Sequence, residues 1–188
     1  MATVLKKRRF TIKEYYQMAE AGILTARDRV ELIEGEVVEM MPIGVRHAGT
    51  VNRLASALWG ALRDQAVVSV QNPVRIAALD SEPQPDVAVL KPRPDFYASA
   101  HPEPEDILLI VEVMDTSTEY DRRVKVPLYA RAGISEVWLV DLTTDTIEVL
   151  RHPAGDRYSD ARSLRRGDQV AISAFADVTL TVAADILG

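Results

Sequence analysis

Apolar residues recur every three or four positions between residues 46 and 62. This is the spacing of one face of an α-helix, and it predicts the longest helix of the chain. The positions are Val51, Leu54, Ala55, Leu58, Trp59 and Leu62. A shorter helix is predicted after Thr11, because Glu14 completes a capping box and Gly22 can end the helix.

Short apolar runs predict the strands. Residues 107–113 are almost wholly apolar, which indicates a central strand covered on both faces. Glu34 and Gly35 suggest a tight hairpin turn between two of the other strands. Those other strands are predicted at residues 30–33, 37–41, 67–70, 74–77, 86–90, 136–141, 146–150, 169–172 and 178–182.

The order of the elements predicts the fold class. A last helix is expected from Asp121, as its N-cap, to about Ala132, and the proline-rich residues 91–106 indicate a surface loop. Strands and helices do not alternate evenly, which argues against a doubly wound parallel sheet. We expect one α/β domain over residues 1–188, with a central mixed β-sheet flanked by helices. An N-terminal hairpin extends this core, and residues 1–10 are expected to be flexible.

Composition narrows the possible chemistry. The 188 residues include no cysteine, which excludes disulfides, thiolate metal ligands and cysteine nucleophiles. The net charge of -6 argues against non-specific binding of nucleic acid over the whole surface, although a local basic patch could still engage phosphates. The basic run at residues 6–9 is not followed by the apolar segment of a signal peptide. We therefore expect a cytoplasmic protein that does not enter membranes.

Two carboxylates stand out among the apolar strands. Asp86 begins one predicted strand, and Glu112 lies within the apolar run 107–113. A carboxylate is costly to bury unless a positive charge lies beside it, and two carboxylates on neighbouring strands would repel each other. A divalent cation such as Mg²⁺ relieves that repulsion and can activate water for attack on a phosphate. The pair therefore predicts a metal site.

Lys125 lies one turn into the helix that follows Glu112. A lysine there could orient the attacking water or stabilise negative charge on the phosphate. Alternatively, Lys125 and Glu112 could form a plain buried ion pair, and the residues alone do not decide between the two. Tyr129 shares a helix face with Lys125. We expect it to pack in the core, the alternative being that it positions Lys125.

Several segments together resemble the Uma-two family. They are ELIEGEVV at residues 31–38, His47, PDVAV at 85–89, VEV at 111–113, YDRRVK at 120–125 and YARAGISEVWLVD at 129–141. The ordered set is more specific than any single piece, and the resemblance extends over roughly residues 10–185. Members of this family are described as restriction endonucleases of the PD-(D/E)xK superfamily.

The resemblance implies a restriction-endonuclease-like core. It also implies Asp86, Glu112 and Val113 as metal ligands, with Mg²⁺ or Mn²⁺ as the cofactor. The usual lysine of this superfamily stands two residues after the glutamate, where this chain has Met114. Families of this type can place that lysine on the following helix, and Lys125 matches this placement.

Glu31 and His47 match two further positions of the family and are candidate catalytic residues. Glu31 could complete the metal site, or it could be an exposed strand carboxylate like its neighbours in the hairpin. His47 could bind phosphate or transfer a proton, or it could face solvent at the start of its helix. Asp121 is interpreted as a helix cap rather than a ligand.

The residues favour a metal-dependent endonuclease that hydrolyses phosphodiester bonds of nucleic acid, with DNA as the expected substrate. A homodimer is expected, because cutting both strands of a duplex calls for two sites. The alternative is a catalytically inactive protein of the same fold that binds nucleic acid or another protein. Met114, in place of the usual lysine, and the negative net charge favour this alternative. A third hypothesis is a structural subunit, although such a protein would not need carboxylates within an apolar strand.

Overall fold

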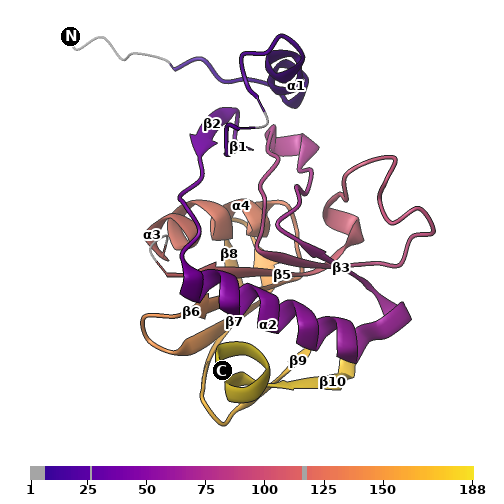
Figure 1. The fold of residues 1–188 in the computed structure, drawn as a ribbon, viewed down its shortest axis with the longest axis vertical. Coiled ribbons are helices and arrows are strands. Elements are labelled where there is room, and N and C mark those ends of the chain that lie inside the picture. The colour runs from indigo at the N-terminus through magenta and orange to yellow at the C-terminus, as the bar shows by residue number, and fades with distance from the viewer. Residues whose placement is uncertain (1–6, 26, 116–117) are drawn as a thin grey trace.

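A mixed β-sheet forms the centre of the molecule (Figure 1). The computed structural model describes residues 7–25, 27–115 and 118–188, and within them the sheet has six strands in the order β3-β4-β5-β6-β7-β8. β5 and β6 run parallel, and the other neighbours are antiparallel. The strands are β3 (Val67–Val70), β4 (Val87–Leu90), β5 (Ile107–Met114), β6 (Glu136–Asp141), β7 (Thr146–Ala154) and β8 (Arg157–Arg165). The predicted α/β class with a central mixed sheet is confirmed.

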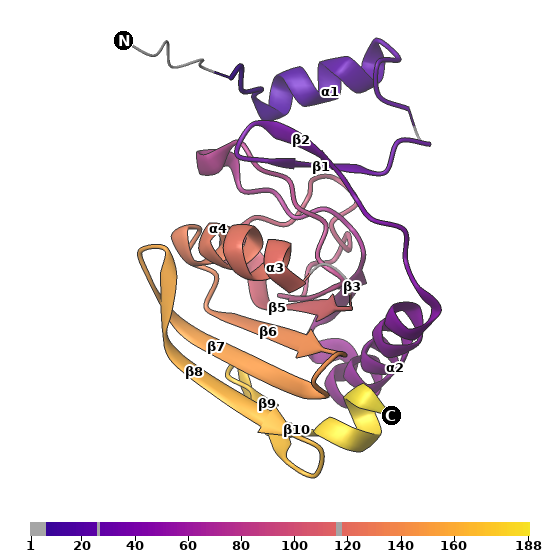
Figure 2. The ribbon, with the colours of Figure 1, turned by 90° about the vertical axis from the view of Figure 1, so that its left-hand side faces the viewer.

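Helices cover both faces of this sheet (Figure 2). The long predicted helix is α2 (Val45–Leu62), and its predicted apolar side packs on one face of the sheet. The opposite face is covered by a continuous helical segment. It consists of α3 (Thr118–Tyr120), the π-helical turn η4 (Asp121–Lys125) and α4 (Val126–Arg131). A hydrophobic core therefore lies on each side of the sheet.

The alternation of side chains along β5 sorts its residues between the two cores. Leu109, Val111 and Val113 pack on the α2 side, whereas Ile110 and Met114 pack on the α4 side. Glu112 stands between the latter two, so the period of the strand points it toward α4 as well. Strand geometry thus places a carboxylate inside an apolar core.

The helical segment opposite α2 begins earlier than predicted. It starts at Thr118, so Asp121 lies inside it, and the prediction that Asp121 caps this helix is wrong. Pro127 lacks the N–H that an α-helix would direct to the carbonyl of Arg123, and the preceding five residues form a π-helical turn. In this turn Asp121 and Lys125 both face inward and are buried.

The N-terminal extension is a helix and a hairpin that lie beyond one side of the sheet (Figure 1). The helix is α1 (Ile12–Glu20), with the predicted capping box between Thr11 and Glu14. The hairpin consists of β1 (Val30–Ile33) and β2 (Glu36–Glu39), as predicted within two residues. Of residues 1–10, for which the sequence predicts flexibility, residues 1–6 lie outside the described residues, so this prediction is not tested.

Two parts of the strand prediction are wrong. Residues 74–77 are not a strand. The backbone N–H groups of Val74 and Arg75 donate to the carbonyls of Pro83 and Pro102, and a proline has no N–H group to return the bond that a β-ladder needs. β8 was not predicted, because its side chains are mostly exposed and show no apolar alternation. Both errors arise where tertiary contacts, rather than local pattern, decide the backbone.

The C-terminal residues complete the α2 side of the molecule. They form the hairpin of β9 (Gln169–Ile172) and β10 (Phe175–Thr181), followed by the turn η5 (Val182–Leu187). The predicted strand 169–172 is confirmed, and the strand predicted at 178–182 begins three residues earlier. In the described part of the chain, every helix is too short or too polar to cross a membrane.

The turn of the N-terminal hairpin requires a glycine at position 35. Glu34 and Gly35 have φ angles of 47° and 77°, as in a type I′ turn. A Cβ atom on Gly35 would lie 2.8 Å from the carbonyl oxygen of Phe10. Both the backbone conformation and the close approach of Phe10 therefore exclude a side chain.

We expect Gly35→Ala to lower the free energy of unfolding clearly more than Gly155→Ala. Gly155 also has a positive φ of 66°, but a Cβ there meets nothing within 4 Å, so its substitution should cost about 1 kcal/mol from backbone strain alone. Gly35→Ala adds the clash with Phe10. Chemical denaturation of both variants measures the difference, and equal losses would contradict the close approach.

Candidate active site

Lys125 lies among three carboxylates in the core on the α4 side of the sheet. Its Nζ atom is 3.3 Å from Oε1 of Glu112, 3.5 Å from Oε2 of Glu31 and 4.0 Å from Oδ1 of Asp121. All four side chains are buried, with at most 7% of each exposed. The structure therefore brings the predicted residues Glu31, Glu112 and Lys125 together and adds Asp121.

These residues come from three separate parts of the chain. Glu112 is supplied by β5, and Glu31 by β1 of the N-terminal hairpin. Asp121 and Lys125 stand four residues apart in η4. The alternative that Glu31 is an exposed strand carboxylate is wrong, because only 3% of its side chain is exposed.

Glu112 is held by Tyr129 as well as by Lys125. The Tyr129 hydroxyl donates a hydrogen bond of 2.6 Å to Oε1 of Glu112, and both residues are fully buried. Burial raises the pKa of Glu112 to about 8, against the opposing effect of Lys125. Tyr129 does pack in the core, as expected, but it also fixes the carboxylate that Lys125 contacts.

Lys125 stays charged in spite of its burial. Desolvation alone would lower the pKa of its ammonium group, but Glu112, Glu31 and Asp121 outweigh it and the pKa is raised. Met114, at the position where the superfamily pattern has its lysine, is fully buried in apolar surroundings. Lys125 approaches Glu112 from the helix instead.

Asp86 lies next to this cluster and is held from three directions. Its Oδ2 atom accepts from the backbone N–H of Val113 at 2.8 Å and lies 3.0 Å from Nε2 of His47, while its Oδ1 atom accepts from Nε2 of Gln71 at 3.2 Å. Asp86 immediately precedes β4, and its carbonyl accepts from the N–H of Gln71, which continues the pairing of β3 with β4. The predicted Asp86 and Glu112 thus stand on adjacent strands, as the sequence indicated.

His47 lies in the first turn of α2 and points toward Asp86. Only 15% of its side chain is exposed, so the alternative of a solvent-facing histidine is wrong. Its hydrogen bond to Asp86 raises the pKa of the imidazole, against desolvation. In the described part of the structure its Nδ1 atom is buried without a hydrogen-bond partner. His47 therefore has one nitrogen committed to Asp86 and one that is free.

Glu31 is fixed on both of its oxygens. Oε1 accepts from the Tyr120 hydroxyl at 3.2 Å, and Oε2 accepts from the backbone N–H of Gln84 at 3.1 Å. Tyr120 belongs to the motif YDRRVK, so the sequence carried a signal for it. Gln71 and Gln84 stand in irregular, proline-containing segments, and no local pattern pointed to them.

The cluster forms the floor of a cleft of about 760 Å³. Glu31, His47, Asp86, Glu112 and Lys125 all line it. One wall is the segment from β2 to α2, which crosses from the hairpin to the main body as an outlying connection (Figures 1 and 2). A cleft of this size is within the range of small-molecule binding sites.

The donor set is compatible with Mg²⁺ or Mn²⁺ only if water completes the coordination. In residues 7–25, 27–115 and 118–188, no three histidine, aspartate or glutamate side chains are grouped as a metal site. Mg²⁺, however, is commonly held by one or two carboxylates together with waters and substrate oxygens. Asp86 and Glu112 suit that mode.

The chain is similar to known proteins in sequence and in fold. A solved structure described as a putative nuclease belonging to DUF820, from Anabaena variabilis ATCC 29413, shares its fold with a TM-score of 0.72. The two are 17% identical, and the match covers 93% of this chain and 96% of that one. No curated protein matches the chain. The model of the Uma2 family, described as "Putative restriction endonuclease", matches residues 12–183, so the chain belongs to this family.

Proposed function

We propose that this protein is a metal-dependent endonuclease that hydrolyses phosphodiester bonds of nucleic acid. One observation carries the proposal: four buried carboxylates adjoin a single buried lysine at the floor of an open cleft. The carboxylates are Glu31, Asp86, Glu112 and Asp121. Besides burial, Asp121 and Asp86 both act to raise the pKa of Glu112, so these carboxylates repel one another, and a divalent cation would relieve that repulsion. Family membership supports a nuclease of the restriction-endonuclease type.

Asp86 and Glu112 are the side chains that would hold the cation. Val113 would add its backbone carbonyl. The N–H of Val113 faces Asp86, and the N–H and carbonyl of one strand residue point to the same side of the strand. A bound Mg²⁺ or Mn²⁺ would supply charge stabilisation at the phosphate and a more acidic water.

The other residues have roles that follow from their contacts. Lys125, kept charged by its neighbours, would donate hydrogen bonds to the attacking water or to the phosphate oxygens, and it would not act as a base. Tyr129 would hold Glu112 in place, and His47 would hold Asp86. In the reaction, the hydroxyl of water bonds to phosphorus, the ester bond breaks, and the leaving oxygen takes up a proton.

DNA as the substrate, a homodimer and a cytoplasmic location stay predictions. A binding protein that has lost turnover is the second candidate, and Met114 is the feature that favours it. The two candidates differ in one respect that can be measured, which is metal-dependent strand cleavage.

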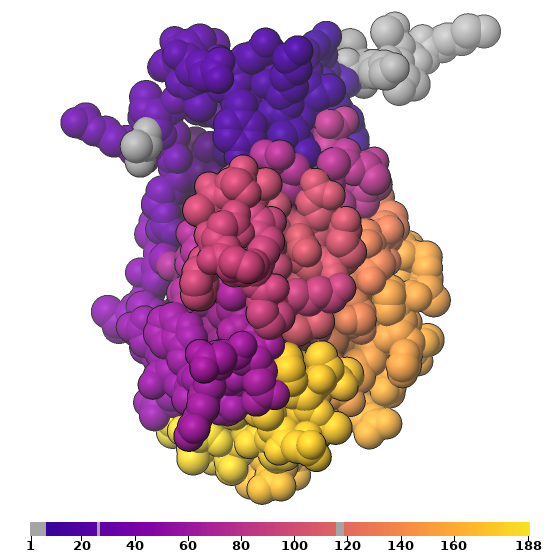
Figure 3. All heavy atoms as spheres, turned by 90° about the vertical axis from the view of Figure 1, so that its right-hand side faces the viewer, coloured from indigo at the N-terminus to yellow at the C-terminus, as the bar shows by residue number. Residues whose placement is uncertain are grey.

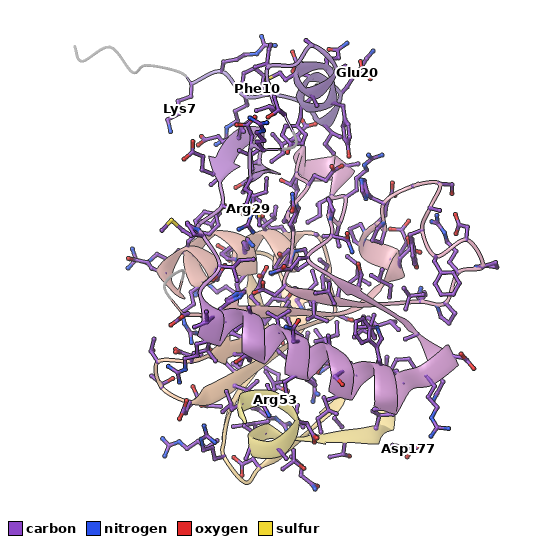
Figure 4. All side chains as sticks on the ribbon, in the orientation of Figure 1. Lys7, Phe10, Glu20, Arg29, Arg53 and Asp177 are labelled. Carbon is purple, nitrogen blue, oxygen red and sulfur yellow. The ribbon has the colours of Figure 1, made fainter. Side chains whose placement is uncertain are left out.

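We expect the wild-type protein to cleave oligonucleotides with Mg²⁺ or Mn²⁺ and not with EDTA. Asp86→Asn should lower the cleavage rate about 100-fold or more, because it removes a charged ligand while keeping the shape of the side chain. Asp177→Asn is the matched control, since Asp177 is exposed on β10 at the far end of the molecule (Figure 4). Its rate should equal that of the wild type.

Cleavage that survives Asp86→Asn would refute the site. A wild-type protein that binds the cation and cuts neither single-stranded nor duplex oligonucleotides would favour the inactive binding protein instead.

Lys125→Met should destabilise the protein in EDTA by about 3–5 kcal/mol, because it leaves buried carboxylates without their cation. Mg²⁺ or Mn²⁺ should recover part of this loss and should stabilise the variant more than the wild type, since the ion takes over the neutralising role. Arg123→Met, in the same turn, removes an exposed ion pair with Glu119 and should cost less than about 1 kcal/mol. Denaturant unfolding with and without the cation measures all three proteins. If the cation leaves the free energy of unfolding of Lys125→Met unchanged, the proposed ligand set is contradicted.

A further inference from the structure

The cleft above the cluster has two chemically different parts. Its floor is charged and buried, whereas one wall is apolar and comes from a single segment of the chain. The apolar residues of this wall are Val38 of β2 and Met40, Met41, Pro42 and Ile43 between β2 and α2, and Glu39 at the end of β2 also lines the cleft. Met41 is 67% exposed and Ile43 is 38% exposed. With a divalent cation bound at Asp86 and Glu112, a ligand that fills this cleft would present an apolar surface on one side and an oxygen-rich, anionic group at the bottom.

The cleft is not a basic groove. Acidic side chains outnumber basic ones in its lining, where the basic residues are Arg29, Arg123, the buried Lys125 and His47, which is paired with Asp86. Arg29 lies where the N-terminal hairpin meets the main body (Figure 4). A protein that grips a nucleic-acid duplex draws its affinity mainly from many lysine and arginine contacts to phosphates. With so few cationic groups, most of the affinity must come from contacts to the apolar wall.

The depth of the floor limits how a phosphate can reach it. Glu112, Glu31, Asp121 and Lys125 are each at most 5% exposed, and Asp86 is 9% exposed. A duplex carries its phosphates on a convex surface and covers the faces of its bases by stacking. A single strand can bend into the cleft, and its unstacked bases are free to lie against protein side chains.

We propose that the cleft binds an unpaired nucleic-acid strand, with one base against Met41 and Ile43 and its phosphate at the Asp86–Glu112 floor. The inference rests on the proposed phosphodiesterase function and names its substrate class. Apolar side chains are known to receive bases that have left the helical stack. A single strand also needs only one active site, so this substrate removes the reason to expect a homodimer.

Binding of labelled oligonucleotides tests this substrate class without relying on turnover. The probes are a fluorescein-labelled 12-nucleotide strand and the same strand annealed to its complement, titrated with wild-type protein in Ca²⁺ and followed by fluorescence anisotropy. We expect the single strand to bind at least about tenfold more tightly than the duplex, as expected when stacking onto protein is available to only one of them.

The apolar wall is tested by the double variant Met41→Ala, Ile43→Ala. It should weaken binding of the single strand about tenfold, because it removes apolar surface that the base would cover. Ile23→Ala and Phe96→Ala are matched controls, since both side chains are apolar and exposed, at 68% and 75%. Neither lines the cleft, and the loop of Phe96 lies on the opposite side of the molecule (Figures 1 and 3). Both controls should bind like the wild type, and circular dichroism checks that all variants are folded.

Salt dependence gives an independent measure. With three arginine and lysine side chains in the cleft, the logarithm of the binding constant should fall with the logarithm of the salt concentration with a slope no steeper than about -2. A duplex held through its backbone would give a much steeper slope.

Equal or tighter binding of the duplex, an unaffected double variant, or no binding of either probe would overturn the inference. Metal-dependent cutting of a tightly bound duplex would overturn it while the proposed nuclease function stands. Preferential binding of the single strand, without cleavage in Mg²⁺ or Mn²⁺, would support the substrate class and refute turnover.

Discussion

The site depends on one constraint, which is the cost of holding carboxylates inside an apolar core. Glu112 lies in this core because the two-residue period of β5 points its side chain to the same face as Ile110 and Met114. Lys125 offsets part of the cost, and the Tyr129 hydroxyl satisfies one oxygen of Glu112. Glu31 and Asp121 place further carboxylates around the same lysine. Under the proposed function, a divalent cation would relieve the repulsion between these carboxylates, which distinguishes the cluster from a plain ion pair.

The surrounding architecture serves to bring these groups together. The π-helical turn before Pro127 places Asp121 and Lys125 on the inner side of the helix. The N-terminal hairpin, which forms no part of the central sheet, contributes Glu31. The segment that leaves this hairpin forms the apolar wall of the cleft. The extension therefore supplies both a charge at the floor of the cleft and one of its walls, so under the proposed function it belongs to the active site as much as the core does.

Pattern alone predicted the elements that are amphipathic or wholly buried, such as α2 and β5, and it predicted Asp86 and Glu112 on neighbouring strands. It could not predict β8, whose exposed side chains carry no periodicity. It also assigned Asp121 to a cap, because a π-helical turn has no local signature beyond the later proline. Gln71 and Gln84 reach the site through irregular backbone, which depends on tertiary contacts. The family resemblance supplied Glu31 and His47 and supported the position of Lys125, since no spacing in the sequence shows that β1 approaches η4.

A divalent cation held between Asp86 and Glu112 is the feature on which the proposed function depends. Anomalous diffraction from crystals grown with Mn²⁺ tests it most directly, because the scattering locates the ion itself. We expect one strong anomalous peak within coordination distance of both carboxylates, roughly 2.0–2.2 Å for hard oxygen ligands, with Lys125 still in contact with Glu112. A protein that crystallises folded in Mn²⁺ with no peak between these two residues would contradict it.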